Sequence, residues 1–439
     1  MKRRFQLIVV LVSLCVFAAG LLTSTKRNVI AENKPVIDPA KDPGLALTNP
    51  DKFNWALLVE ISKKAPANLQ GTVTVGGKAI TTNNAIWETW ASDLLTFPAQ
   101  PDPSNPPVFP KQSAKSKKLT AISQQLPKGV IPNRPITGGV KEGGGEEVLR
   151  NEAAFNYIIQ NNLWYVEGLK CAFNRGNDSG GQPKGQRPNG RNINFPVDAI
   201  EVKAIWIPIT EAQKPVFHWN YDDKGNLFGM NALHIMSKTI PNWTWATWEW
   251  SGNPGRCDWL GCHDSFGITP ANIAPIYNPN GTPPTSNYGT ASGQTYPPGT
   301  VTPALLKMFA DAGYDAEWSA EWQNYRLKGS MIDFTDITGQ PILVGNSVTE
   351  AGFVQTASCM TCHVNASVDK NGIFNQSVGF TEQGQSRSGA VDPGWFYDTN
   401  TWDNTLMNYQ TAYYPIDFVW AILKAQPAAK GKKVPACSQ

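Results

Sequence analysis

The run Cys359-Met360-Thr361-Cys362-His363 has the residue types and spacing for the most specific chemistry in the chain. Two thiols about one helical turn apart can each add across a vinyl group of a porphyrin, and the histidine after the second thiol can then bind the iron. We therefore expect Cys359 and Cys362 to hold haem c covalently and His363 to be the proximal iron ligand. The alternatives are a redox-active thiol pair, a zinc knuckle or coincidence.

A second cluster, Cys257, Cys262 and His263, has the spacing C-x-x-x-x-C-H. Some multihaem cytochromes attach haem through this wider loop, so a second haem is one interpretation. A disulfide across a short loop, with His263 merely adjacent, is the other. A zinc site that combines these two cysteines with Cys359 and Cys362 is disfavoured, because structural zinc ribbons have much shorter spacers.

Besides His263 and His363, the chain contains His218 and His234. His234 lies in an apolar strand-like run and is either a core residue or the distal iron ligand, and we take it as the candidate ligand. His218 is interpreted as a structural residue. A methionine could instead bind the iron as its distal ligand and would raise its reduction potential, although most methionines only pack in hydrophobic cores. The methionines considered are Met230, Met236 and Met407.

The N-terminus predicts export. Lys2, Arg3 and Arg4 precede a mostly apolar run over residues 5–22, and small residues suited to cleavage occur at 18–20 and 29–31. This is the layout of a secretory signal, and the run is also just long enough for a membrane anchor. We expect a periplasmic or otherwise exported protein, with membrane attachment through residues 5–22 as the alternative to cleavage. Six cysteines follow residue 31, and this even number suits haem thioethers plus disulfides.

Charge and composition exclude one class of partner. Residues 1–31 carry five positive charges and no negative one, so the formal charge of +3 becomes −2 without them. Because the basicity belongs to the signal, nucleic acid is not an expected partner. The chain has only 17% charged residues but 16 Trp, 38 Gly and 34 Pro. That composition indicates an exported, loop-rich globular protein with an aromatic core.

The hydrophobic patterns predict an α+β fold with a helical N-terminal part and a β-rich middle with long loops. The predicted regions are a signal or anchor over 1–31, a helical and loop-rich region over 32–195, a β-rich region over 196–340 and a haem c-binding region over 341–439. Helices are expected over 50–64, 84–95, 146–167, 302–313 and 415–426. Strands are expected over 200–207, 232–237 and 243–250, where the tryptophans change face and indicate a bulge or burial on both sides.

At Cys359, Cys362 and His363 the chain resembles c-type cytochromes, and as a whole it resembles larger exported bacterial cytochromes with one late C-x-x-C-H motif. The resemblance implies a C-terminal cytochrome c-like haem segment and redox proteins as partners. It implies transfer of single electrons, with no catalytic residue. The roughly 350 residues outside this segment exceed what an electron shuttle needs.

Two other functions remain open. A haem-dependent oxidoreductase could act on peroxide, oxygen or a small substrate at an open distal face, because a β-rich body with tryptophan-bearing strands can form the walls of a site. A non-catalytic module could use haem to sense a ligand or to hold the fold together. Nucleotide-binding loops, nucleophile elbows and H-E-x-x-H zinc motifs are missing from the sequence.

Overall fold

The computed structural model describes residues 37–110, 145–177, 193–275, 295–350, 353–373, 387–403 and 408–437. The chain divides into two compact units, Met1–Lys34 and Pro35–Gln439, and every described residue lies in the second. The predicted signal over 1–31 and Met407 lie outside the described residues. None of the described helices is long and apolar enough to cross a membrane.

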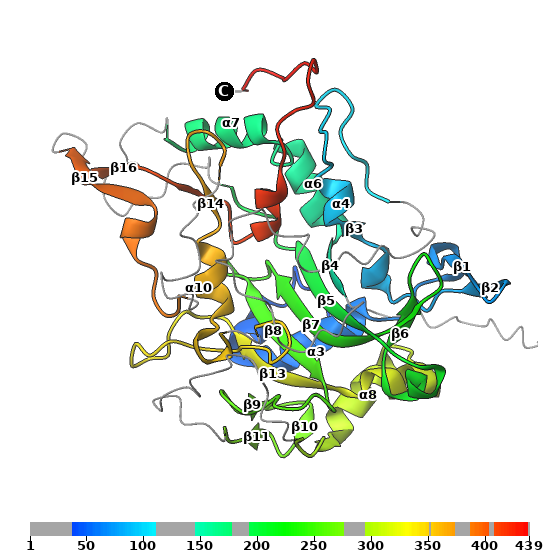
Figure 1. Cartoon of the computed structure of the whole chain (residues 1–439). Helices are drawn as coiled ribbons and strands as arrows, with labels where there is room; N and C mark the ends of the chain where they lie inside the picture. The colour runs from blue at the N-terminus through cyan, green and yellow to red at the C-terminus, as the bar shows by residue number, and fades with distance from the viewer. Residues whose placement is uncertain are drawn as a thin grey trace, which may run out of the picture. The chain divides into compact units, whose positions relative to one another are not determined.

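A seven-stranded antiparallel sheet forms the centre of the second unit (Figure 1). The strands pair in the order β13-β8-β7-β5-β4-β3, and β6 pairs with β7. The three predicted strands are confirmed, and the second is longer than expected. The bounds are β3 Ala91–Ser92, β4 Gly145–Arg150, β5 Ile200–Pro208, β6 Trp219–Tyr221, β7 Leu227–Ser237, β8 Thr244–Trp250 and β13 Tyr325–Met331.

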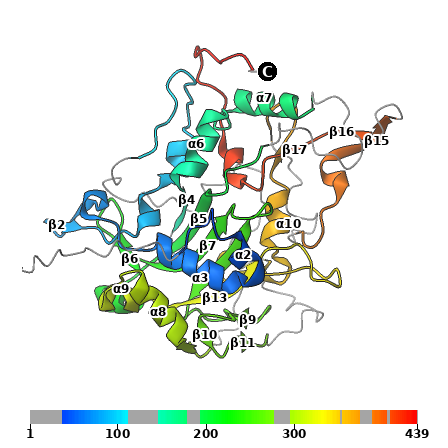
Figure 2. The ribbon, with the colours of Figure 1, turned by 180° about the vertical axis from the view of Figure 1, so that it is seen from behind.

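The two faces of this sheet have different roles. Alternate residues such as Val202, Leu233 and Trp248 belong to the larger core, which also includes residues of α3, α8 and α9. Figure 2 shows α3 across the sheet on this side. The opposite face contributes Met236 and Trp245 to a second core, which also includes residues of α6, α7 and the C-terminal segment. The helices are α2 Pro43–Thr48, α3 Pro50–Ile61, α4 Asp93–Thr96, α6 Glu152–Gln160, α7 Val166–Asn177, α8 Pro303–Asp311, α9 Ala316–Trp322 and α10 Cys359–Val364.

Two helices whose ends carry clear capping residues form where they are predicted. The side chain of Asn49 accepts a hydrogen bond from the backbone N–H of Lys52 at 3.1 Å and caps α3. Thr302 caps α8 in the same way, and Gly313 follows it with a φ of +82°. The helix expected over 84–95 is wrong, because that segment is split into the 3₁₀ helix η2 Ile86–Thr89, then β3 and α4.

The helix predicted over 146–167 is correct only in its middle part, α6. Its first part is β4, in which Val148 pairs with Lys203 of β5, so inter-strand hydrogen bonds replace helical ones. Asn151 then caps α6, and α7 follows as a separate helix. Gly168 lies inside α7, where a Cβ would come within 1.7 Å of the carbonyl oxygen of Asn162.

Among the described residues of 341–439, α10 is the only α-helix. The predicted helix over 415–426 is reduced to the 3₁₀ helix η6 Trp420–Lys424, because Asp417 and Phe418 adopt φ values of +52° and +69°. The C-terminal region also contains η4 Val354–Thr356, β14 Ser367–Val368, η5 Pro393–Trp395, β15 Tyr397–Asp403, β16 Asn408–Thr411 and β17 Tyr414–Pro415. The cytochrome c-like arrangement of this region therefore stays a prediction.

Shorter elements complete the described residues. They pair as two-stranded sheets, β1 with β2, β9 with β11, β10 with β12, β14 with β17 and β15 with β16. Their remaining bounds are β1 Thr72–Val75, β2 Lys78–Thr81, β9 Cys262–His263, β10 Ile268–Thr269, β11 Asn272–Ile273 and β12 Thr300–Val301, with the 3₁₀ helices η1 Ala67–Leu69 and η3 Glu211–Val216.

Candidate haem-attachment site

The five residues of the C-x-x-C-H motif lie on α10. Ser358 precedes the helix, and its carbonyl accepts the backbone N–H of Cys362 at 2.9 Å. The thiols of Cys359 and Cys362 are both free and both partly exposed. Burial raises the pKa of Cys362 to about 12 and that of Cys359 further still. Protonated thiols of this kind do not favour a redox-active pair, which needs a stabilised thiolate.

His363 is held in one tautomer. Its Nδ1 lies 2.9 Å from the carbonyl oxygen of Phe418, which can only accept, so Nδ1 carries the proton and Nε2 has the lone pair. Burial lowers the pKa of His363 to about 4, so the imidazole is neutral near pH 7. A neutral histidine whose other nitrogen donates to a backbone carbonyl is the usual form of a metal-binding histidine.

Two tryptophans flank the imidazole. The ring centre of Trp245, on β8, lies 4.6 Å from that of His363, and the ring of Trp420 lies edge-on at 6.3 Å. The indole N–H of Trp420 also donates to the carbonyl of Cys362 at 3.1 Å. The C-terminal segment and β8 together fix α10 on the sheet, and Figure 1 shows α10 on the side of β8.

His234 lies on the same face of the sheet, paired with Lys203 on one side and Thr247 on the other. Its Nε2 is 3.7 Å from a carboxylate oxygen of Glu350 and 3.5 Å from the hydroxyl of Thr247. Burial, with the nearby Lys203 and His363, holds the pKa of His234 well below its ordinary value. His234 is therefore neutral and lies within electrostatic range of His363.

Glu350 adds a second titratable group here. Burial raises its pKa to about 7, although the nearby Lys203 acts in the opposite direction. Glu350 also affects both thiols, since its charge contributes to the raised pKa of Cys359 and of Cys362. Glu350 and Lys203 were not predicted as site residues from the sequence. Charged residues at alternate positions of an otherwise apolar strand, as at Glu201 and Lys203 in β5, could have indicated this face.

Cys257 and Cys262 form a disulfide, with their Cα atoms 5.2 Å apart. The disulfide interpretation is confirmed, because the two thiols are bonded to each other, and the alternative of a second haem here stays an untested prediction. His263 is exposed, contacts Asn272 through Nδ1, and lies 3.6 Å from a carboxylate oxygen of Asp51. The described residues contain no group of three or more His, Cys, Asp or Glu side chains that could hold a metal ion by itself.

A second disulfide, Cys171–Cys437, joins α7 to the end of the chain. The six cysteines after residue 31 are therefore two disulfides and the two free thiols of α10. This is the distribution that covalent haem plus disulfides would require.

His218 lies away from α10. It is fully buried between the carboxylates of Glu88 and Glu321 and stacks on Trp322 at 4.6 Å. Burial alone would lower its pKa, but the two carboxylates raise it to about 9. His218 is thus a charged member of a buried network, an arrangement with no local sequence signal.

Comparison with known proteins adds no assignment. No family model matches the chain, and neither the curated proteins nor the solved structures give a match.

Proposed function

We propose that this protein is an exported c-type cytochrome that binds one haem covalently and transfers single electrons. Cys359 and Cys362 would form the two thioethers, and His363 would bind the iron through Nε2. The observation that carries the proposal is the tautomer of His363. Its Nδ1–H donates a hydrogen bond to the carbonyl of Phe418, so the lone pair of Nε2 is free to bind, one residue after a free thiol of a C-x-x-C pair.

The residues of this chain fit such a group. Each thiol would add its sulfur to one carbon of a vinyl group and its proton to the other, which a protonated thiol supplies. When bound, haem supplies an iron that gains and loses one electron. The Phe418 carbonyl makes Nε2 of His363 a stronger donor and fixes its ring, while Trp245 and Trp420 pack beside it.

His234 is the candidate distal ligand. It is neutral, lies on the sheet face that carries α10, and is near enough to His363 for that imidazole to contribute to its lowered pKa. Two histidine ligands would saturate the iron, which favours electron transfer because neither ligand must leave. Redox proteins are the expected partners, and nucleic acid is not.

A haem oxidoreductase is the second candidate, and the contact between His234 and Glu350 favours it. A neutral imidazole 3.7 Å from a carboxyl group whose pKa is about 7 could transfer protons to a bound peroxide or oxygen. Replacing His234 with Ala separates the two functions. Loss of the low-spin spectrum identifies a ligand, whereas loss of turnover with an unchanged spin state identifies a distal catalytic group.

Export is part of the proposal. The apolar run over residues 5–22 would direct the chain to the periplasm or beyond, or anchor it in the membrane. Two disulfides are consistent with an oxidising compartment, which is also where haem c is attached.

The decisive measurement is the intact mass of protein expressed with a cytochrome c maturation system. We expect the mature chain plus one haem, and the haem mass to disappear in the Cys359→Ser/Cys362→Ser variant. The matched control, Cys257→Ser/Cys262→Ser, should keep one haem. A haem-free wild type, prepared beside a known c-type cytochrome that loads normally, would contradict the proposal. A high-spin ferric protein that readily binds cyanide or peroxide would favour the oxidoreductase.

A further inference from the structure

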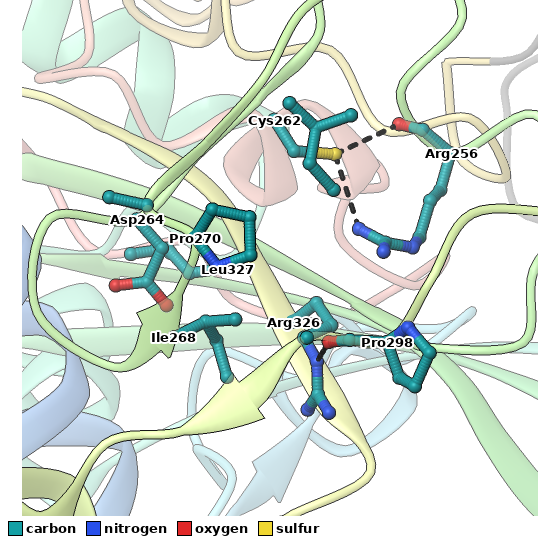
Figure 3. Close-up of a pocket in the computed structure, with 11 residues that line it drawn as sticks. Arg256, Cys262, Asp264, Ile268, Pro270, Pro298, Arg326 and Leu327 are labelled. Atoms are coloured by element: carbon teal, nitrogen blue, oxygen red, sulfur yellow. Dashed lines mark hydrogen bonds between the residues drawn. The ribbon is translucent and has the colours of Figure 1, made fainter.

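The disulfide Cys257–Cys262 lies against a buried arginine. Arg256 is 2% exposed, and its Nη1 lies 3.3 Å from the sulfur of Cys257 and 3.4 Å from that of Cys262. Its Nη2 donates to the carbonyl of Pro297 at 2.7 Å, and its Nε has no hydrogen-bond partner. Among the described residues, no carboxylate lies within 4.0 Å of this guanidinium. Figure 3 shows the guanidinium directed at the sulfur of Cys262.

A second buried cation reaches the same sulfur. Nζ of Lys328, on β13, lies 3.6 Å from the sulfur of Cys262 and donates to the carbonyl of Gly261 at 3.1 Å. Its nearest carboxylate is Glu249, at 3.9 Å. Burial lowers the pKa of Lys328 and of Arg256, so both cations are poorly compensated where they lie.

The oxidised disulfide compensates the positive charge of these two cations poorly. Disulfide sulfurs are neutral and weak acceptors, whereas a thiolate at the same place would accept charge-assisted hydrogen bonds from both cations. Cationic neighbours stabilise thiolates and so favour the reduced form of a disulfide. The two cations therefore stabilise the reduced cysteine pair more than the disulfide.

We propose that Cys257–Cys262 is a redox-active disulfide that a dithiol reductant opens to a thiol and a thiolate held by Arg256 and Lys328. Cys257 is fully buried, whereas Cys262 is 8% exposed and lines a cavity with Arg256 and Arg326 (Figure 3). Cys262 is therefore the sulfur that a reductant can attack. This inference does not depend on haem at α10.

The reaction balances as thiol–disulfide exchange. A thiolate of the reductant bonds to the sulfur of Cys262, the S–S bond breaks, and Cys257 leaves as a thiolate beside Arg256. The second thiol of the reductant then displaces Cys262 and closes the reductant's own disulfide. Two electrons pass to the protein. Of the two protons lost by the reductant, one goes to Cys257 and the other to solvent, so Cys262 is left as the thiolate that Arg256 and Lys328 hold.

The other charged groups around the disulfide come from four segments. One is Asp264, which follows β9 and lines the same cavity, and burial raises its pKa to about 6. Asp258, in the loop between the two cysteines, accepts the hydroxyl of Tyr296 at 2.6 Å. Glu249 comes from β8 and faces Lys328. Arg326 comes from β13 and lines the cavity, but its Nη1 donates to the backbone carbonyls of Gln323 and Tyr325. Arg326 is thus a matched control, a buried arginine in the same cavity that does not hydrogen-bond to sulfur.

The test equilibrates the full protein with mixtures of reduced and oxidised dithiothreitol, then alkylates the free thiols and quantifies both cysteine pairs by mass spectrometry. Cys171–Cys437 is the internal reference, because no described cation donates a hydrogen bond to its sulfurs. We expect Cys257–Cys262 to be half-reduced at a reduced-to-oxidised ratio at least about tenfold lower than the reference, or ~30 mV for two electrons. Arg256→Gln and Lys328→Gln should each raise that ratio several-fold, Arg256→Gln by about tenfold, whereas Arg326→Gln should change it less than about threefold.

The pH dependence tests the proposal without any variant. Because reduction of Cys257–Cys262 releases one proton, the ratio of reduced to oxidised dithiothreitol that half-reduces it should fall as pH rises, toward about tenfold per pH unit. The same ratio for Cys171–Cys437 should stay constant. Circular dichroism shows whether each variant is folded. Equal ratios for the two disulfides, or a pH-independent ratio for Cys257–Cys262, would overturn the proposal.

Discussion

Nδ1 of His363 donates a hydrogen bond of 2.9 Å to the backbone carbonyl of Phe418, 55 positions later in the chain. Phe418 and Asp417 both have positive φ, so the chain turns at this point instead of continuing as a helix. The last segment of the protein thereby fixes the tautomer of the candidate iron ligand. Any change in this segment should affect α10 first.

Trp420→Phe tests this connection. The variant removes the hydrogen bond from the indole to the carbonyl of Cys362 but keeps an aromatic ring at the position. We expect a loss of about 1 kcal/mol in the free energy of unfolding, together with faster amide hydrogen exchange in residues 359–364. The matched control is Trp250→Phe, which loses a similar bond to the carbonyl of Val216. Equal exchange in α10 for both variants would refute the connection.

Gly168→Ala should be strongly destabilising. A Cβ at this position would lie 1.7 Å from the carbonyl oxygen of Asn162, so the turn between α6 and α7 would have to move. We expect a loss of about 3 kcal/mol or more, measured by urea denaturation. Gly44→Ala in α2 is the control, because a Cβ there would meet nothing within 4 Å, and it should gain about 0.5–1 kcal/mol.

The network around His218 should make stability depend on pH. Burial opposes its charge, but Glu88 and Glu321 raise the pKa of His218 from 6.5 to about 9. A raised pKa gives stability that is complete below about pH 6.5 and is lost as pH rises through about 9. We expect this contribution to be on the order of 3 kcal/mol. The difference in unfolding free energy between wild type and His218→Gln should shrink over this window, and a constant difference would contradict the assignment.

Arg150 joins the sheet to the segments around it. It is fully buried and forms ion pairs with Asp93 and Glu201, while Lys424 of η6 also pairs with Asp93. Arg150→Met should cost about 3–5 kcal/mol in urea denaturation, because it leaves buried carboxylates without their guanidinium. A control at an exposed pair, Lys307→Met beside Asp311, should cost less than about 1 kcal/mol. Similar losses of unfolding free energy for the two variants would show that the buried ion pairs stabilise the fold no more than an exposed pair does.

Local signals determined part of the fold from the sequence alone. The caps at Asn49 and Thr302 and the glycine at Gly313 involve hydrogen bonds and backbone angles within a few residues, so they predict α3 and α8 correctly. The strand predicted over 243–250 is buried along both faces, as its change of tryptophan face indicates. The mixed α+β class follows from these patterns.

The segments that failed depend on distant partners. Residues 146–150 carry a helical pattern, but pairing with β5 makes them a strand, because the sheet offers hydrogen bonds that no local pattern reveals. In residues 415–426 the positive φ values of Asp417 and Phe418 interrupt a pattern that otherwise suits a helix. In both cases long-range contacts outweighed local propensity.

The candidate site was likewise determined partly by the sequence and partly by the tertiary structure. The spacing of Cys359, Cys362 and His363 is a property of five consecutive residues, so the sequence determined it completely. The carbonyl that accepts the hydrogen bond of His363, the position of His234 beside Glu350, and the position of Lys328 beside Cys262 come from segments far apart in the chain. Only the tertiary structure could decide them, because hydrogen bonding and electrostatics act over a few ångströms of space whatever the separation in sequence.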